Sequence, residues 1–562
     1  MSALVWCCVL AGCSGDQADT VLLDGRFWTG DTDQPWAEAV AIEGDRLVAV
    51  GTRAEVEALV GPTTRVIELG GRLATPGFID NHTHFDRAGA LLLGVNLLDV
   101  SDGETLARRV AEARDRLPQG AWIQGGDWGA YEAWSQGSSG AKGQVTAPFE
   151  PHRAMIDDIT GENPVLLSKW DRSQYLANAV ALASAAVGCD WEGVDCDEAG
   201  APTGRLEPVA AHRIRASIPE KSLEQRLSEA RVALTRLAEN GITGIHDITS
   251  ASQLEVFQRL ESDGELTTRV YARPTLDQWQ HLAALGIRHG FGDEWIRIGG
   301  LKGFVDGIMG NSSARFYEPY LTSGEVGSWR AMMSPEGNMP RLIEGAIEAG
   351  HWPQIHAIGD EAIDTLLDFF ESALEQTESR PRLRVIHTQV IRGSEVADRM
   401  ARLGIVAEVQ PYHAIDDMRW MEQRIGQRAR WAYAFRTLHE AGVMLSFGSD
   451  WPGTNASWYP SSALLGIYAA VTRQTLDGTP AEGWFPQERV DLETALRAYT
   501  VNNAWAAGEE ALKGALEVGK LADLVVLDRD LFAIAPEEIK ATEVLATFVG
   551  GRLVLDRLTG QP

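Results

Sequence analysis

The chain has 562 residues, of which 44% are hydrophobic, with 18 Trp and 15 Phe, and this composition excludes a disordered protein. A single hydrophobic core stops growing at roughly 250–300 residues, so we expect one large domain with a second domain or insertions. The formal net charge of −29 argues against a nucleic-acid partner, because a phosphate backbone needs clustered Lys and Arg.

Residues 1–17 predict a secretion signal followed by a short tether. The run from Met1 to Cys13 is apolar and too short to cross a bilayer as a helix. It ends in Leu-Ala-Gly-Cys, which resembles the signal of bacterial lipoproteins, although no Lys or Arg precedes Cys13. We expect an exported protein, periplasmic or anchored to the membrane only through a lipid on Cys13; the alternative is an accidental resemblance.

Cys189 and Cys196 flank a short polar loop. In an exported protein this pair predicts a local disulfide, whereas in the cytosol the two residues would be free thiols.

Both ends of the chain have the pattern of short strands separated by turns. In residues 18–76, two apolar runs flank Gly44-Asp45, which is a hairpin signal. Residues 512–562 have the same pattern of short apolar runs separated by turns. Because unpartnered terminal strands would leave exposed edges, we expect both segments to form one small β-sandwich domain.

Between these ends, in residues 77–511, short apolar runs alternate with longer helical patterns. The predicted helices span 105–117, 222–240, 339–349, 361–375, 393–403 and 494–503. Repeated strand–helix units with near-continuous apolar strands predict an α/β fold with a parallel sheet, and their number suits a (β/α)₈ TIM-type barrel. Residues 132–220, rich in Gly, Pro and Ala, are expected to form an insertion over the barrel mouth.

Polar residues follow several of these apolar runs. His82 and His84 lie one residue apart, so an extended strand directs both imidazoles to one side; an exposed turn with two polar rings is an equal alternative. His356, His387 and Asp450 end later runs. Each alone suits a core histidine or a helix cap, but together at strand ends they predict a divalent metal site, with zinc as the expected ion.

Lys302 lies inside an apolar strand, in a chain that has few lysines. One interpretation is a salt bridge to Asp306. The other is reaction of the amine with CO₂ to give a carbamate, an anion that can bridge two cations. A neutral amine is needed for this reaction, and burial beside cations lowers the pKa of a lysine to provide it.

These motifs, in this order, resemble the metal-dependent amidohydrolases, in particular the branch of N-substituted formamide deformylase. They are Gly-Phe-Ile-Asp before His82, Leu-Lys-Gly-Phe-Val-Asp-Gly around Lys302, Ile-His-Ala-Ile-Gly-Asp around His356, Val-Ile-His-Thr-Gln around His387 and Phe-Gly-Ser-Asp-Trp-Pro around Asp450. The resemblance runs from about Val21 to Leu555. It implies a barrel with a β-sandwich and hydrolysis of a non-peptide C–N bond with one or two metal ions.

The resemblance assigns roles to the residues at matching positions. It implies that Asp450 is both a metal ligand and the general base, and that Lys302 is a carboxylated bridge. The remaining ligands would be His82, His84, His356 and His387. The sequence departs from the family at Ser173, where a His is usual, and this suggests an altered specificity; Ile386 replaces a frequent Glu.

Candidate substrate contacts lie just past strand ends, where packing is an equally good explanation. They are Asp127, Trp128, Tyr412, His413 and Trp451, together with Ser173. The expected substrate is a small amide or formamide. Hydrolysis of an ester, lactone or phosphoester at the same site is the alternative, and a ligand-binding surface lipoprotein with a decayed site is the non-enzyme alternative. A homodimer stays open.

Overall fold

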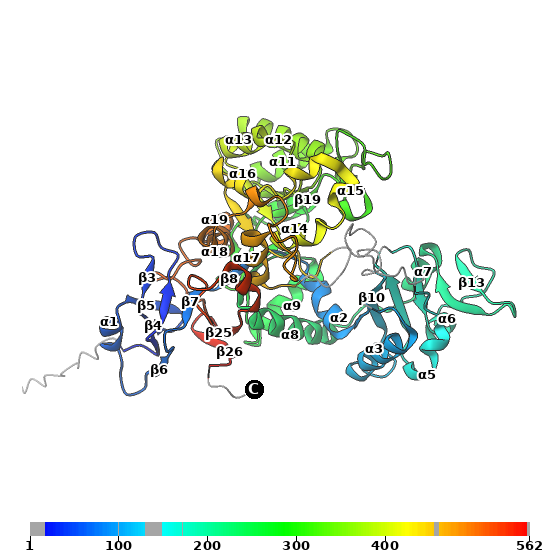
Figure 1. The fold of residues 1–562 in the computed structure, drawn as a ribbon, viewed down its shortest axis with the longest axis horizontal. Coiled ribbons are helices and arrows are strands. Elements are labelled where there is room, and N and C mark those ends of the chain that lie inside the picture. Colours follow the sequence, from blue (N-terminus) through cyan, green and yellow to red (C-terminus); the bar gives the residue numbers. More distant parts are fainter. Residues whose placement is uncertain (1–16, 99, 130–148, 171, 454–459, 559–562) are drawn as a thin grey trace, which may run out of the picture.

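The computed structural model describes residues 17–98, 100–129, 149–170, 172–453 and 460–558 (Figure 1). Among these residues, no helix is long and apolar enough to cross a membrane. Cys13, the predicted acylation site, lies outside the described residues.

The central unit contains two five-stranded sheets, whose long strands are all parallel. One consists of β8 (Phe78–Thr83), β15 (Ile242–Ile248), β16 (Arg269–Arg273), β18 (Ile296–Ile298) and an antiparallel edge strand, β17 (Phe291–Gly292). The other consists of β19 (Leu301–Phe304), β20 (Pro353–Ala357), β21 (Arg384–His387), β22 (Val406–Val409) and β23 (Leu445–Phe447). Single bridges, Thr83 to Trp451 and Thr275 to Lys302, connect the two sheets at both junctions. This arrangement is the predicted TIM-barrel-like α/β fold.

Helices connect and surround these strands. They include α2 (Phe85–Leu93), α8 (Leu223–Glu239), α9 (Ala251–Ser262), α10 (Trp279–Ala284), α11 (Asn338–Glu348), α12 (Asp360–Glu375), α13 (Ser394–Leu403), α14 (Pro411–Asp417), α15 (Met421–Ile425), α16 (Phe435–Glu440) and α17 (Ala463–Thr472). Local sequence fixes their ends: the Ser222 side chain caps α8 by accepting from the Gln225 amide, and Gly404 ends α13 in the left-handed conformation.

The predicted single helix over 494–503 is wrong, because two helices occupy this region. They are α18 (Leu492–Tyr499) and α19 (Val501–Ala507), which meet at Thr500, where φ is −131° and ψ is −91°. The Asn503 amide donates to the backbone oxygens of Ile79 and Phe447 at 2.5 and 2.8 Å. These bonds hold α19 against β8 and β23, a tertiary contact that local periodicity does not reveal.

The two chain ends lie side by side in a β-rich region, at the left of Figure 1. One sheet has the order β5 (Arg46–Gly51), β4 (Ala39–Glu43), β1 (Thr20–Leu23), β6 (Arg65–Glu68). The second has the order β26 (Arg552–Asp556), β25 (Val544–Val549), β24 (Leu524–Leu527), β7 (Leu73–Pro76), β2 (Arg26–Trp28), β3 (Trp36–Ala37). Since β24 pairs with β7, N- and C-terminal segments share a sheet, and buried residues of both sheets form one hydrophobic cluster.

A side lobe projects from the central unit, at the right of Figure 1. Its sheet has the order β13 (Val194–Cys196), β14 (Pro202–Leu206), β12 (Tyr175–Ala177), β11 (Val165–Lys169), β10 (Ile123–Trp128), β9 (Val95–Asn96). Its helices are α3 (Gly103–Arg116), α5 (Asp157–Thr160), α6 (Ala179–Ser184) and α7 (Pro208–Arg215).

The lobe begins earlier than the insertion predicted for 132–220, because β9 and β10 precede that range. The apolar runs that form β10 and β11 had the pattern of barrel strands. They pair parallel in the lobe, and a parallel strand that is buried on both faces has the same sequence pattern in either sheet.

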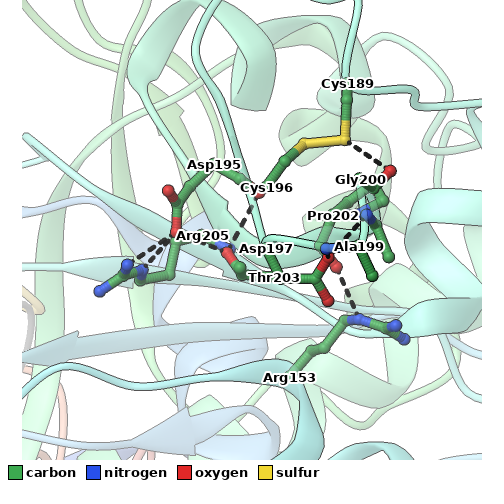
Figure 2. The surroundings of a disulfide bond; sticks show 11 residues. Arg153, Cys189, Asp195, Cys196, Asp197, Ala199, Gly200, Pro202, Thr203 and Arg205 are labelled. Carbon is green, nitrogen blue, oxygen red and sulfur yellow. Dashed lines mark hydrogen bonds and ion pairs between the residues drawn. A yellow bond between two sulfur atoms is a disulfide. The ribbon is translucent and has the colours of Figure 1, made fainter.

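A disulfide joins Cys189 to Cys196 at the tip of this lobe (Figure 2). The Cys189 sulfur also lies 3.2 Å from the Gly200 oxygen, and Asp197 Oδ1 accepts from the backbone amides of Ala199 and Ala201. The disulfide therefore belongs to a tightly hydrogen-bonded loop that leads into β14.

Candidate metal centre

The strand ends of the central unit bring the predicted ligands into one cluster. His84 Nε2 lies 3.1 Å from Asp450 Oδ1, and His82 Nε2 lies 3.5 Å from the same oxygen. Ligand atoms of His82, His387 and Asp450 all lie within 4.8 Å of one another. Lys302 Nζ is 3.4 Å from His82 Nε2, and the His356 and His387 ring centroids are 4.6 Å apart.

Each of three imidazoles uses one ring nitrogen for a hydrogen bond to the protein. His82 Nδ1 lies 2.7 Å from Glu408 Oε1, and His387 Nδ1 lies 2.7 Å from Gln410 Oε1. His356 Nε2 lies 2.8 Å from the Gly307 carbonyl oxygen. Since all three partners are acceptors, these nitrogens donate, and the opposite nitrogen of each ring keeps a lone pair for a metal.

The protonation states also suit a metal. Burial and Lys302 lower the pKa of His82 well below its usual value, and burial with His356 does the same for His387, so both rings are neutral near pH 7. Burial opposes ionisation of Asp450, but His82 and His84 outweigh it and hold the pKa of this carboxyl well below its usual range.

Lys302 is fully buried in β19, and burial together with Arg273 lowers its pKa to about 7. Within the described residues, Oδ1 of Asp450 accepts no hydrogen bond although it is buried. A buried carboxylate oxygen without a donor, facing imidazole nitrogens, is the environment that a divalent cation satisfies. The donor set therefore fits the metal that the sequence predicts.

A buried charge network lies behind His82, and sequence reasoning did not single it out. Glu408 of β22 accepts from Arg273 Nη1 at 2.8 and 3.0 Å and from Arg384 Nη1 at 3.0 Å. Arg273 Nη2 donates to the His246 carbonyl oxygen at 2.7 Å. The available signal was a Glu inside the apolar run that forms β22.

A cavity of about 930 Å³ opens over the cluster. Its apolar wall includes Trp170, Phe304, Ile308, Met309, Met332 and Trp420, and its charged wall includes Arg330, Asp416, Asp417 and Arg424. These walls come mainly from the loop after β19 and from α14 and α15. A volume of this size suits a small-molecule substrate.

Of the predicted substrate contacts, His413 lines this cavity. Asp127 forms an ion pair with Arg172 in the side lobe, and Trp128 is buried in the hydrophobic core of that lobe. Trp451 is buried in the core of the central unit, and Tyr412 packs against that core. Ser173 is exposed, whereas Trp170 from the same turn reaches the cavity.

The cavity wall carries a pH-sensitive carboxyl group. Burial and the neighbouring Asp416 raise the pKa of Asp417 to about 8, and its Oδ2 accepts from Gln389 at 2.7 Å and from Tyr433. Between about pH 4 and 8 the folded protein binds a proton here that the unfolded chain does not, so the free energy of unfolding falls as pH rises.

The free energy of unfolding should fall between pH 6 and 8 in both proteins, and the fall should be about 2 kcal/mol smaller in Asp417→Asn than in wild type. Melting temperatures at both pH values measure it. Asp115→Asn, at an exposed acid, is the control and should keep the wild-type slope. Equal slopes for Asp417→Asn and wild type would contradict the prediction.

Comparison with known proteins agrees with this geometry. The chain is 31% identical to LONG AFTER FAR-RED 3 of Arabidopsis thaliana, over 96% of this chain and 92% of that protein. It is 28% identical to N-substituted formamide deformylase of Arthrobacter pascens, over 96% and 98%. The crystal structure of an uncharacterized metal-dependent hydrolase from Pyrococcus furiosus superposes with a TM-score of 0.72 at 26% identity, covering 91% of this chain and 99% of that one.

The family model of the amidohydrolases matches residues 65–555, a range that includes the whole clustered set of histidines, lysine and aspartate. With most of the chain matched and the cluster in place at the strand ends, the chain belongs to the amidohydrolase family, as the sequence motifs predict, and is a metal-dependent hydrolase.

Proposed function

We propose that this hydrolase cleaves a non-peptide C–N bond of the amide or formamide type. The observation that carries the proposal is the cluster itself: imidazoles whose donating nitrogens are engaged by the protein meet the Asp450 carboxylate at the floor of a cavity. The Arthrobacter pascens relative, a formamide deformylase by name, supports the choice of bond.

In the proposed site, Asp450 and the four histidines hold one or two divalent ions, with zinc as the expected metal. The histidines are His82, His84, His356 and His387. When bound, such an ion lowers the pKa of a coordinated water to about 7 and polarises a substrate carbonyl.

Lys302 is proposed to carry the carbamate. Its neutral amine attacks CO₂, a C–N bond forms, and one proton leaves to solvent. The surrounding charge supports this, because within the described residues two buried guanidiniums, of Arg273 and Arg384, share the single carboxylate of Glu408. A further anion at Lys302 would balance the second guanidinium.

Asp450 is the proposed general base. Its carboxylate takes a proton from the attacking water as the water oxygen bonds to the acyl carbon, and it returns that proton to the nitrogen as the C–N bond breaks. The products are a carboxylic acid, which is formic acid for a formamide, and an amine. The apolar wall around Trp170 and Trp420 would hold the substituent.

The finer architecture and the location are part of the proposal. The bridges at both sheet junctions support a closed barrel, and the shared hydrophobic cluster supports a β-sandwich of the two end sheets. The Cys189–Cys196 disulfide supports export, since disulfides persist in oxidising compartments. A lipid on Cys13 and a homodimer stay predictions.

Protein reconstituted with zinc should hydrolyse members of an amide and formamide panel and contain at least one zinc ion per chain. The same preparation is assayed on esters, lactones and phosphoesters, and zinc is measured by inductively coupled plasma mass spectrometry. Turnover of those substrates without amide turnover would favour the alternative bond. Substoichiometric zinc without turnover would favour a binding protein with a decayed site.

A further inference from the structure

The charge network behind His82 has a consequence for metal binding. We propose that Glu408 is a positioning residue: it fixes the protonated nitrogen and the direction of His82, and Arg273 and Arg384 hold Glu408 in place. The inference rests on the proposed metal site and concerns its affinity for the metal.

The hydrogen bond of His82 differs in kind from those of the other ligands. Two groups contact His82 Nδ1: Glu408 Oε1 at 2.7 Å and Arg273 Nη2 at 3.2 Å. Arg273 Nη2 already donates to the His246 carbonyl oxygen at 2.7 Å, and a carboxylate only accepts, so the shorter contact with Glu408 places the proton of His82 on Nδ1. His82 Nε2 then presents its lone pair toward Asp450 Oδ1, 3.5 Å away. His387 and His356 form their hydrogen bonds with neutral acceptors, Gln410 and the Gly307 carbonyl, and the carboxylate of Asp306 lies farther from His356 Nε2, at 3.4 Å. A charged acceptor at hydrogen-bond distance forms the stronger bond and makes the ring a better donor to a metal.

The two arginines leave the Glu408 carboxylate little freedom. Arg273 Nη1 contacts both oxygens, at 2.8 and 3.0 Å, and Arg384 Nη1 contacts Oε2 at 3.0 Å. Arg273 is itself anchored on the His246 carbonyl oxygen, and the side chains of Glu408, Arg273 and Arg384 are 0% exposed. The carboxylate therefore cannot rotate away from His82 without breaking ionic hydrogen bonds.

A contribution to the stability of the fold does not explain the presence of this buried Arg273–Glu408–Arg384 network. Buried Arg–Glu–Arg groups contribute little net stability, and apolar residues of similar volume often replace them without loss. A network that ends on a ligand nitrogen has a more specific consequence: loss of the partner behind a metal-binding histidine typically weakens metal affinity about 10- to 100-fold.

The test uses the full-length protein stripped of metal and titrated with Zn²⁺ against a competing chelator. For Glu408→Gln, which keeps the shape and removes the charge, we expect a Kd about 10- to 100-fold weaker than wild type. The visible spectrum of the Co²⁺-loaded protein should also shift, because a reoriented imidazole changes the ligand field.

Asp523→Asn is the matched control. Asp523 accepts from Arg269 at 2.7 and 3.0 Å, and both side chains are at most 5% exposed, so this substitution also takes a carboxylate from a buried guanidinium. Asp523 directly precedes β24, a strand of the sheet that the two chain ends share. We expect a lower melting temperature with the wild-type Kd for zinc.

Glu408→Asp guards against misfolding, because it keeps a negative charge between the arginines and withdraws the oxygens from His82 by one methylene. We expect a folded protein with weakened zinc binding. Wild-type zinc affinity in both Glu408 variants, or zinc binding weakened equally in Asp523→Asn, would overturn this inference and leave the proposed function standing. A wild-type protein that binds no zinc would overturn the proposed function together with the inference.

Discussion

Asp450→Asn is expected to lower kcat for the amide substrate by about 10²- to 10⁴-fold, the usual contribution of a general acid–base group. The amide has the shape of the carboxylate but cannot take a proton from water near neutral pH. In the native site, His82 and His84 keep the pKa of Asp450 well below its usual range, so the carboxylate is ionised and ready to accept. Steady-state kinetics on the substrate found in the panel measure the effect.

Asp450 also contacts the metal site, so zinc content must accompany the kinetics. We expect some loss of zinc, and kcat is therefore expressed per bound zinc. Asp523→Asn provides the matched change at a remote buried aspartate and should keep kcat within a few-fold of wild type. An Asp450→Asn protein with full zinc and wild-type kcat would show that another group moves the proton.

The cluster was predictable because its members end apolar runs. In parallel strand–helix units the carboxyl ends of the strands converge, so the sequence predicts that these residues meet: His82, Lys302, His356, His387 and Asp450. The motif order then gave the family. Pairing of the chain ends followed from the need to cover terminal strand edges, and β24 pairs with β7 accordingly.

The residues that support the cluster were less accessible to sequence reasoning. Gln410 faces His387 because of the register between β21 and β22, and Glu408 reaches His82 of β8 from the other sheet; a single apolar run carries information on neither. Gly307 contributes a backbone oxygen, which any residue type provides. Such contacts depend on tertiary geometry, and residue identity gives at most a polar residue in an apolar strand as a signal.

The cavity wall was the least predictable part. Trp170, Met309 and Trp420 come from connecting segments that lack hydrophobic periodicity, and the side lobe brings one of them. The position of Asp127 and Trp128 at the end of an apolar run predicts contact with the substrate, but that run belongs to the lobe sheet. Strand ends mark a site only when the strand belongs to the sheet that carries the site.

The second large effect is expected at Lys302. Lys302→Ala should lower the zinc content and reduce kcat/KM by at least about 100-fold. Loss of a residue that only supports a metal ligand already lowers metal affinity or activity by up to about 100-fold, and Lys302→Ala removes an anion proposed to contact the metal directly. Short carboxylic acids such as acetate or propionate, added to the variant, should restore part of the activity by placing a carboxylate in the vacated space.

Lys513→Ala is the matched control, because Lys513 is also buried but pairs with Glu509 at 2.8 Å. It should keep the zinc content, and carboxylic acids should not change its activity.

In wild type, the pKa of Lys302 near 7 means that the fraction of neutral amine increases as the pH rises through that value. CO₂-dependent reactivation of stripped protein should therefore be faster at pH 8 than at pH 6 at equal dissolved CO₂. A ¹³C carbamate signal after incubation with labelled bicarbonate would identify the anion, and its absence would mean that Lys302 serves the site as a plain amine. Full activity in Lys302→Ala would mean that the site does not need Lys302.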